Sequence, residues 1–142
     1  MTARILLTVV ALCGVLRADL QQAKDEPNLE KRAMLALDNA TQALTQARDA
    51  YAKGDNDHVT ALATEITSSV ELADTSLRET GKNPRKRPKW FKRAESSTRE
   101  LLRRLDGFQQ QMDVGDRPLL DTAKAKVQQI HDALLLGVLE GK

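Results

Sequence analysis

Apolar residues recur at spacings of three and four along residues 28–53, which places them on one face of a helix. Asn28 precedes the pattern and suits a helix N-cap, and Gly54 follows it as a C-terminal stop. A row of alanines at intervals of seven lies beside this stripe and would let a neighbouring helix approach closely. The stripe consists of Leu29, Ala33, Leu37, Ala40, Leu44, Ala47 and Tyr51, and the row consists of Ala36, Ala43 and Ala50.

A second apolar stripe predicts a helix over residues 57–80, from Val59 to Leu77. The polar residues 55–57 can cap its start, and Gly81 closes it. Serines and threonines lower the intrinsic helix propensity of this segment, but its apolar period is clear. Because the link between the first two helices is short, we expect them to be antiparallel neighbours.

Two further helices are predicted at residues 88–113 and 117–140. Pro88 suits the first turn of the earlier helix, and Asp116 is a candidate cap for the later one. Gly107 interrupts the earlier pattern without breaking its register, so we expect that helix to be continuous. The two stripes are Phe91, Ala94, Thr98, Leu101, Leu105, Phe108 and Met112, then Leu120, Ala123, Val127, Ile130, Leu134 and Val138.

The four predicted helices indicate an all-α, up-down-up-down four-helix bundle made of two antiparallel hairpins, with coiled-coil-like spacing of its apolar residues. The composition agrees, because aromatic residues make up only 3% of the chain and much of its 41% hydrophobic content is alanine. We predict a flexible leader at residues 19–27, the bundle at 28–142 and a basic linker at 81–88 within it.

The first eighteen residues have the layout of a secretory signal peptide. Arg4 gives a positive start, residues 5–16 are mostly apolar, and Ala18 stands before a polar sequence. The apolar run is shorter than the ~20 residues that span a bilayer. We predict cleavage after Ala18 and a periplasmic or secreted mature chain. Lipidation at Cys13 is less favoured, because Leu12 stands where a lipoprotein signal has a small residue.

Charge is segregated between the two halves of the predicted mature chain. Residues 19–80 carry six basic and twelve acidic side chains, a net charge of −6. Residues 81–142 carry fourteen basic and eight acidic side chains, a net charge of +6. The formal net charge of +2 for the whole chain therefore hides an acidic half and a basic half.

Residues 82–93, here called the basic segment, contain seven Lys or Arg residues, no acidic residue and the single tryptophan of the chain. Such a segment can bind an anionic envelope component or an acidic protein, with its aromatic residue at a bilayer interface. Export argues against nucleic acid as the partner. The alternative is a solvated loop whose charge balances the acidic half. The candidate residues are Lys82, Arg85, Lys86, Arg87, Lys89, Trp90, Lys92 and Arg93.

A homodimer, in which the basic half of one copy meets the acidic half of another, would use the same charges. Phe91 belongs to the core stripe, so we expect it to be buried. Trp90 next to it is expected either to cover the end of the bundle or to contact the partner.

His131 is the candidate ligand of a second function, a small-ligand or cofactor carrier that uses the bundle interior. In an antiparallel bundle His131 is level with Met34, and a Met and a His so placed would suit haem. A partly exposed structural histidine is the simpler interpretation. The sequence contains no paired Glu-x-x-His motif, no zinc-binding cysteine pair, no glycine-rich phosphate loop and no recognisable catalytic triad. We therefore predict a binding or interaction module without a cofactor or metal, and not an enzyme.

Four phrases of the chain resemble those of uncharacterised secreted proteins of acidobacteria. They are Asp25-Glu-Pro-Asn-Leu-Glu-Lys-Arg32, Gly81-Lys-Asn-Pro-Arg85, Pro88-Lys-Trp-Phe-Lys-Arg-Ala-Glu95 and His131-Asp-Ala-Leu-Leu-Leu-Gly137. The resemblance covers most of the predicted mature chain and implies export and a helical fold. It implies no activity, so it assigns no functional residue.

Overall fold

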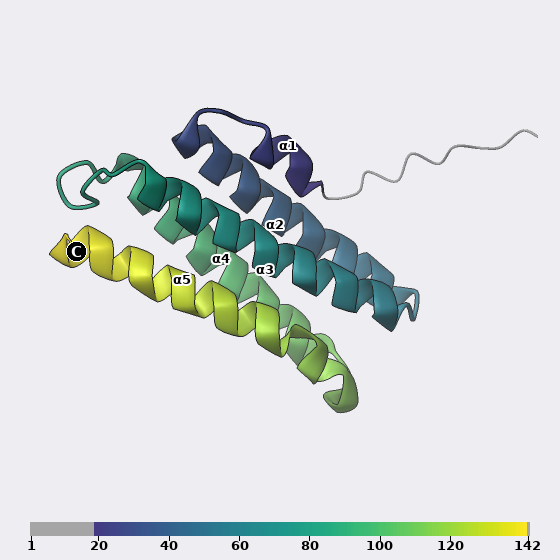
Figure 1. Cartoon of the computed structure of the whole chain (residues 1–142). Coiled ribbons are helices and arrows are strands. Elements are labelled where there is room, and N and C mark those ends of the chain that lie inside the picture. Colours follow the sequence, from purple (N-terminus) through teal and green to yellow (C-terminus); the bar gives the residue numbers. More distant parts are fainter. Residues whose placement is uncertain (1–18, 142) are drawn as a thin grey trace, which may run out of the picture.

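Four long helices make up most of the structure, a computed structural model that describes residues 19–141 (Figure 1). They are α2 (Leu29–Ala52), α3 (Asn56–Glu79), α4 (Lys89–Gln111) and α5 (Asp121–Glu140). The short helix α1 (Leu20–Lys24) precedes them, and the 3-10 helix η1 (Val114–Leu120) lies between α4 and α5. Residues 19–141 contain no strand. The predicted all-α bundle is confirmed, whereas the signal peptide prediction concerns residues 1–18, outside the described part of the chain.

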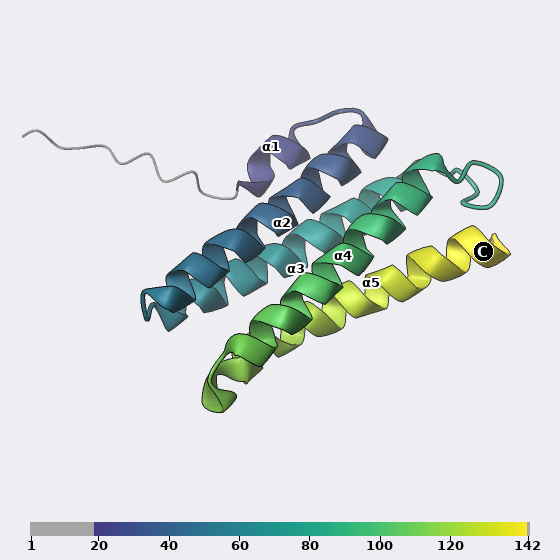
Figure 2. The same ribbon diagram turned by 180° about the vertical axis from the view of Figure 1, so that it is seen from behind.

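The long helices form two antiparallel hairpins that pack on each other. The pair α2 and α3 is the acidic hairpin, and the pair α4 and α5 is the basic one. Helix α2 also packs on α4, and α3 also packs on α5. Figure 2 shows α4 between α2 and α5, which lie at opposite corners of the bundle and make no contact with each other.

The buried face of α2 consists mainly of alanine. Its contact with α3 is the most extensive in the bundle, as expected when small side chains let two helix backbones approach. The row of alanines that the sequence singled out belongs to this face. The buried alanines, each at most 4% exposed, are Ala33, Ala36, Ala40, Ala43, Ala47 and Ala50.

A buried amide links α2 to α3 within this apolar contact. The Asn39 side-chain nitrogen donates to Ser69 Oγ and to Glu65 Oε1, each at 2.9 Å. Both Asn39 and Ser69 are buried, so the hydrogen bond between them satisfies polar groups that water cannot reach. The apolar stripes do not predict this pair.

The predicted flexible leader at residues 19–27 is wrong for its first part, which forms α1. The Asp19 carboxylate accepts a hydrogen bond from the Gln21 backbone N–H at 2.9 Å and so caps the helix. Leu20 and Ala23 are buried, and α1 packs on α2. One capped turn with two apolar residues is enough to dock this segment on the bundle.

The connection between α4 and α5 also differs from the prediction. Helix α4 is continuous through Gly107, as expected, but residues 114–120 form η1 and α5 begins only at Asp121. Asp116 does not cap α5. Its carboxylate instead accepts hydrogen bonds from the Tyr51 hydroxyl at 3.0 Å and from Asn56 Nδ2 at 3.2 Å.

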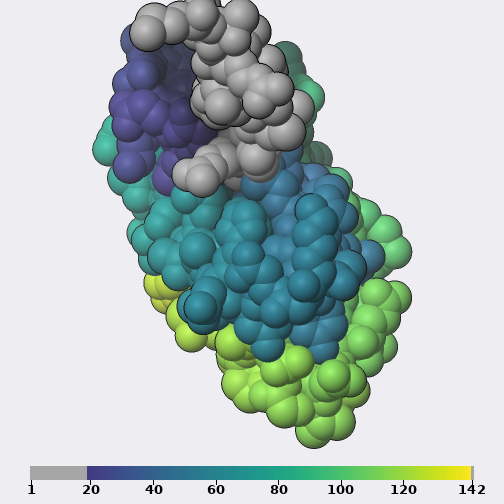
Figure 3. Space-filling model, turned by 90° about the vertical axis from the view of Figure 1, so that its right-hand side faces the viewer, coloured from purple at the N-terminus to yellow at the C-terminus, as the bar shows by residue number. Residues whose placement is uncertain are grey.

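These hydrogen bonds fasten the α2–α3 turn to η1. The Tyr51 hydroxyl also accepts a hydrogen bond from the Asp113 backbone N–H at 2.9 Å. Figure 3 looks onto this end of the bundle, where the atoms of the turn lie directly on those of the α4–α5 connection. The basic segment lies at the opposite end of the molecule (Figure 1).

Candidate functional site

The first part of the basic segment, residues 82–88, is the loop that joins α3 to α4, and its conformation is set mainly by Asn83. The side-chain oxygen of Asn83 accepts hydrogen bonds from the backbone N–H groups of Arg85 at 2.9 Å and Lys86 at 3.2 Å. Its backbone oxygen accepts one from Arg87 N–H at 2.9 Å. Asparagine often closes turns in this way. The loop therefore presents its cations on a fixed backbone, and an asparagine before a proline is the sequence signal for such a turn.

The same asparagine ties the loop to the end of α5. Its Nδ2 donates to the Gly141 backbone oxygen at 3.2 Å. Gly141 has a φ of 71° and lies against the Arg85 side chain, and a Cβ at this glycine would approach Arg85 Cβ to 3.0 Å. Glycine therefore suits both the backbone conformation and the close contact at this position.

Six of the seven cations in the basic segment form no ion pair with any residue in the range 19–141. Lys82 alone pairs, with Glu30 at the start of α2. The acidic hairpin therefore balances little of the charge of the loop. The six unpaired cations are all exposed, and they are Arg85, Lys86, Arg87, Lys89, Lys92 and Arg93.

Trp90 is half-buried and packs against the core, while Phe91 is buried as predicted. Lys89 Nζ lies 4.9 Å and Arg93 Cζ 5.8 Å from the centroid of the Trp90 ring. Both distances are within cation–π range. Trp90 thus anchors the start of α4 and holds two cations beside it.

The Lys82–Glu30 pair gives the loop a measurable pH dependence. The hydrogen bond from Lys82 is the main cause that lowers the pKa of the Glu30 carboxyl below its ordinary value near 4.5. A carboxyl group with a lowered pKa in the folded state adds stability above the pKa of the unfolded chain. That contribution is lost as the pH falls through the pKa of the folded state.

We expect the Glu30→Gln variant to lose less stability than wild type between about pH 5 and pH 2, because it lacks the titrating partner of Lys82. The difference should be about 1–3 °C in Tm, as befits a partly exposed pair. Thermal unfolding followed by circular dichroism across this pH range measures it. Glu79→Gln is the control, since Glu79 is exposed and forms no ion pair with the described residues; an equal effect there would contradict the assignment.

His131 is buried between α4 and α5, so the expectation of a partly exposed histidine is wrong. Its Nδ1 lies 3.1 Å from Thr98 Oγ1 and its Nε2 lies 3.8 Å from Glu95 Oε1. Arg99 holds the same carboxylate through two hydrogen bonds, at 2.8 and 3.1 Å. Both ring nitrogens therefore face side chains of α4, which makes His131 a link between the two helices.

The predicted proximity of Met34 to His131 is not found. Met34 lies on α2 in a groove that it shares with Trp90 and Arg93, whereas His131 lies on α5. The two residues are kept apart because α2 and α5 occupy opposite corners of the bundle. Residues 19–141 bring together no group of three His, Cys, Asp or Glu side chains that could hold a metal ion.

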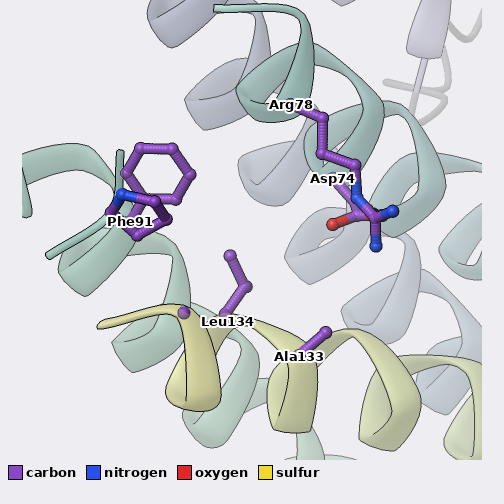
Figure 4. Close-up of a pocket in the computed structure, with 7 residues that line it drawn as sticks. Asp74, Arg78, Phe91, Ala133 and Leu134 are labelled. Atoms are coloured by element: carbon purple, nitrogen blue, oxygen red, sulfur yellow. Dashed lines mark ion pairs between the residues drawn. The ribbon is translucent and has the colours of Figure 1, made fainter. Parts of the chain in front are cut away.

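A groove of about 320 Å³ runs between α3, the start of α4 and α5 (Figure 4). Phe91 and Leu134 supply apolar surface, and Asp74 pairs with Arg78 at 3.0 Å on the α3 side. Pro84 of the basic segment and Gly137 of α5 also line it. The groove therefore shows a second place where the loop lies close to the last turns of α5.

No family model, curated protein or solved structure matches the chain. The resemblance to secreted proteins of acidobacteria therefore stays a prediction. Within residues 19–141, no helix is both long enough and apolar enough to cross a membrane.

Proposed function

We propose that this protein is a non-enzymatic binding module that engages an anionic partner through its basic segment. The observation that carries the proposal is the set of six exposed cations without ion pairs, three on the loop that Asn83 shapes and three in the first turns of α4. Because the loop conformation is already fixed, little ordering entropy would be lost on binding. The predicted export favours a partner in the periplasm or outside the cell over a nucleic acid.

The contacts of the charged residues support this proposal over simple charge balance. Of the candidate cations, only Lys82 is paired across the two hairpins. A carrier function in the bundle interior gains no such support, because both ring nitrogens of His131 face α4. The alternative partner is the acidic hairpin of a second copy of this chain. A measurement of self-association distinguishes this homodimer from binding to a different anionic partner.

Neutralising Arg85, Lys86 and Arg87 together to glutamine tests the proposal. Binding to inorganic polyphosphate should weaken on the order of a hundredfold at about 50 mM salt. The slope of log K against log salt should fall by roughly one for each lost cation. Isothermal titration across a salt series measures both quantities.

The matched control removes three exposed cations elsewhere, in the variant Lys24→Gln, Lys53→Gln, Arg103→Gln. Its net charge equals that of the loop variant, so a generic charge effect would weaken both alike. The two variants should melt within a few degrees of wild type, since exposed charges add little stability. Polyphosphate binding that is unchanged in the loop variant, or that ignores salt, would overturn the proposal.

A further inference from the structure

The last turns of α5 expose three leucines that no other element covers. Leu135, Leu136 and Leu139 are 39%, 53% and 64% exposed, and we call them the leucine patch. Within the described residues the only other exposed large apolar side chain is Val114, in η1 at the far end of the bundle. Exposed apolar surface is therefore concentrated at one end of the molecule.

This end is also the end that carries the basic segment. Asn83 donates to the Gly141 oxygen, and Arg85 lies against the same glycine, two residues beyond the leucine patch. Figure 1 shows the loop beside the end of α5. The basic segment and the leucines thus lie at the same end of the molecule, with Arg85 the cation that the structure places against the end of α5.

The contact between Glu95 of α4 and His131 of α5 shows which cation of α4 lies level with Leu135, the first leucine of the patch. Lys92 precedes Glu95 by three residues and Leu135 follows His131 by four, so each lies one turn away on the same flank of its helix. Because α4 and α5 are antiparallel, both steps lead toward the basic end. Lys92 and Leu135 are therefore level with each other at the outer edge of the α4–α5 contact.

We infer that the anionic partner is a lipid bilayer surface, which this end of the bundle meets with the basic segment at the headgroups and the leucine patch at the acyl boundary. This inference rests on the proposed function, since the loop supplies the charge. A soluble polyanion would satisfy the cations but leave the leucines in water. An anionic bilayer satisfies both, because the apolar face of an interfacial helix is buried about 5–10 Å into the boundary between headgroups and acyl chains.

The surroundings of the leucine patch favour shallow docking. Most of the exposed residues before it on α5 are polar, including Gln128, Gln129 and Asp132, and Glu140 stands at its end. These groups favour water, so only the last two turns of the helix can enter the interface. At the far end, Asp113, Asp116 and Asp121 add negative charge that an anionic surface repels.

The test compares vesicles of phosphatidylcholine with and without about a third phosphatidylglycerol, using the predicted mature chain. Wild type should partition to the anionic vesicles only. Replacing the leucine patch with serines should weaken that partitioning at least tenfold and leave polyphosphate binding unchanged. Val114→Ser, the matched control for an exposed apolar residue, should match wild type in both assays.

Trp90, the single tryptophan, reports the orientation. Vesicles with brominated acyl chains should quench its fluorescence, because Trp90 lies at the end that docks. Thermal unfolding verifies that the serine variant remains folded, as its exposed positions predict.

The outcomes separate the two proposals. If the leucine variant partitions like wild type, or if wild type binds polyphosphate but no vesicle, the lipid surface is wrong and the anionic-partner proposal stands. If neutralising the loop leaves both assays unchanged, both proposals fall. If ultracentrifugation shows that the leucine variant loses self-association while no vesicle binds, a second copy covers the leucines and the inference is overturned.

Discussion

The Leu105→Ala variant is expected to lose about 2–5 kcal/mol of unfolding free energy, the usual cost of removing a fully buried leucine. Leu105 is 0% exposed in the C-terminal half of α4, within the single hydrophobic core of the bundle. The loss combines the transfer free energy of the deleted atoms with the cost of the cavity that remains. Urea unfolding followed by circular dichroism measures it, with the slope against urea serving as a check on two-state behaviour.

Leu136→Ala is the matched control, because this leucine of α5 is more than half exposed. Its change should stay within about 0.5 kcal/mol, as for surface substitutions generally. Equal losses in the two variants would mean that α5 buries its other face, and the packing of the two hairpins described above would be wrong.

The double variant Ala36→Leu, Ala43→Leu is expected to cost about 2–6 kcal/mol, in this case by overfilling the core. Both alanines are 0% exposed on the close contact of α2. Each leucine would have to push the helices apart or leave its preferred rotamer, at about 1–3 kcal/mol per site. The sites are two helical turns apart, roughly 10 Å, so their effects should nearly add.

Gln42→Leu on the exposed side of α2 is the control for this variant. It introduces the same side chain next to Ala43 but in water, and its unfolding free energy should be close to that of wild type. If the Ala36→Leu, Ala43→Leu variant were as stable as the control, the conclusion that α2 and α3 approach each other closely would be wrong.

The helices were predictable from the sequence because their apolar residues repeat at the helical period and glycines end three of them. One error arose where a single polar side chain makes long-range contacts. Asp116 has the position of a helix cap but hydrogen bonds to Tyr51 and Asn56 instead. Short-range patterns could not anticipate partners some sixty residues away.

The candidate site was predictable in composition but not in arrangement. The run of Lys and Arg identified the basic segment, and Asn83 before a proline signalled a turn. Which cations are paired depends on where Glu30 lies in space, and this follows only from the packing of α2 on the bundle. The expected Met34–His131 pair failed for the same reason, because helical period alone does not show which helices occupy opposite corners.

Because the buried face of α2 consists mainly of alanine, its own side chains do little to oppose sliding of α2 along α3. A shift of one turn, about 5.4 Å, would move the alanines of α2 past the next row of α3 side chains. It would also separate Asn39 from Ser69 and Glu65, leaving a buried amide without partners at a cost of about 1–3 kcal/mol. Asn39 therefore fixes the register of α2 against α3. The same register sets how far the start of α2, and with it Glu30, extends toward the basic segment.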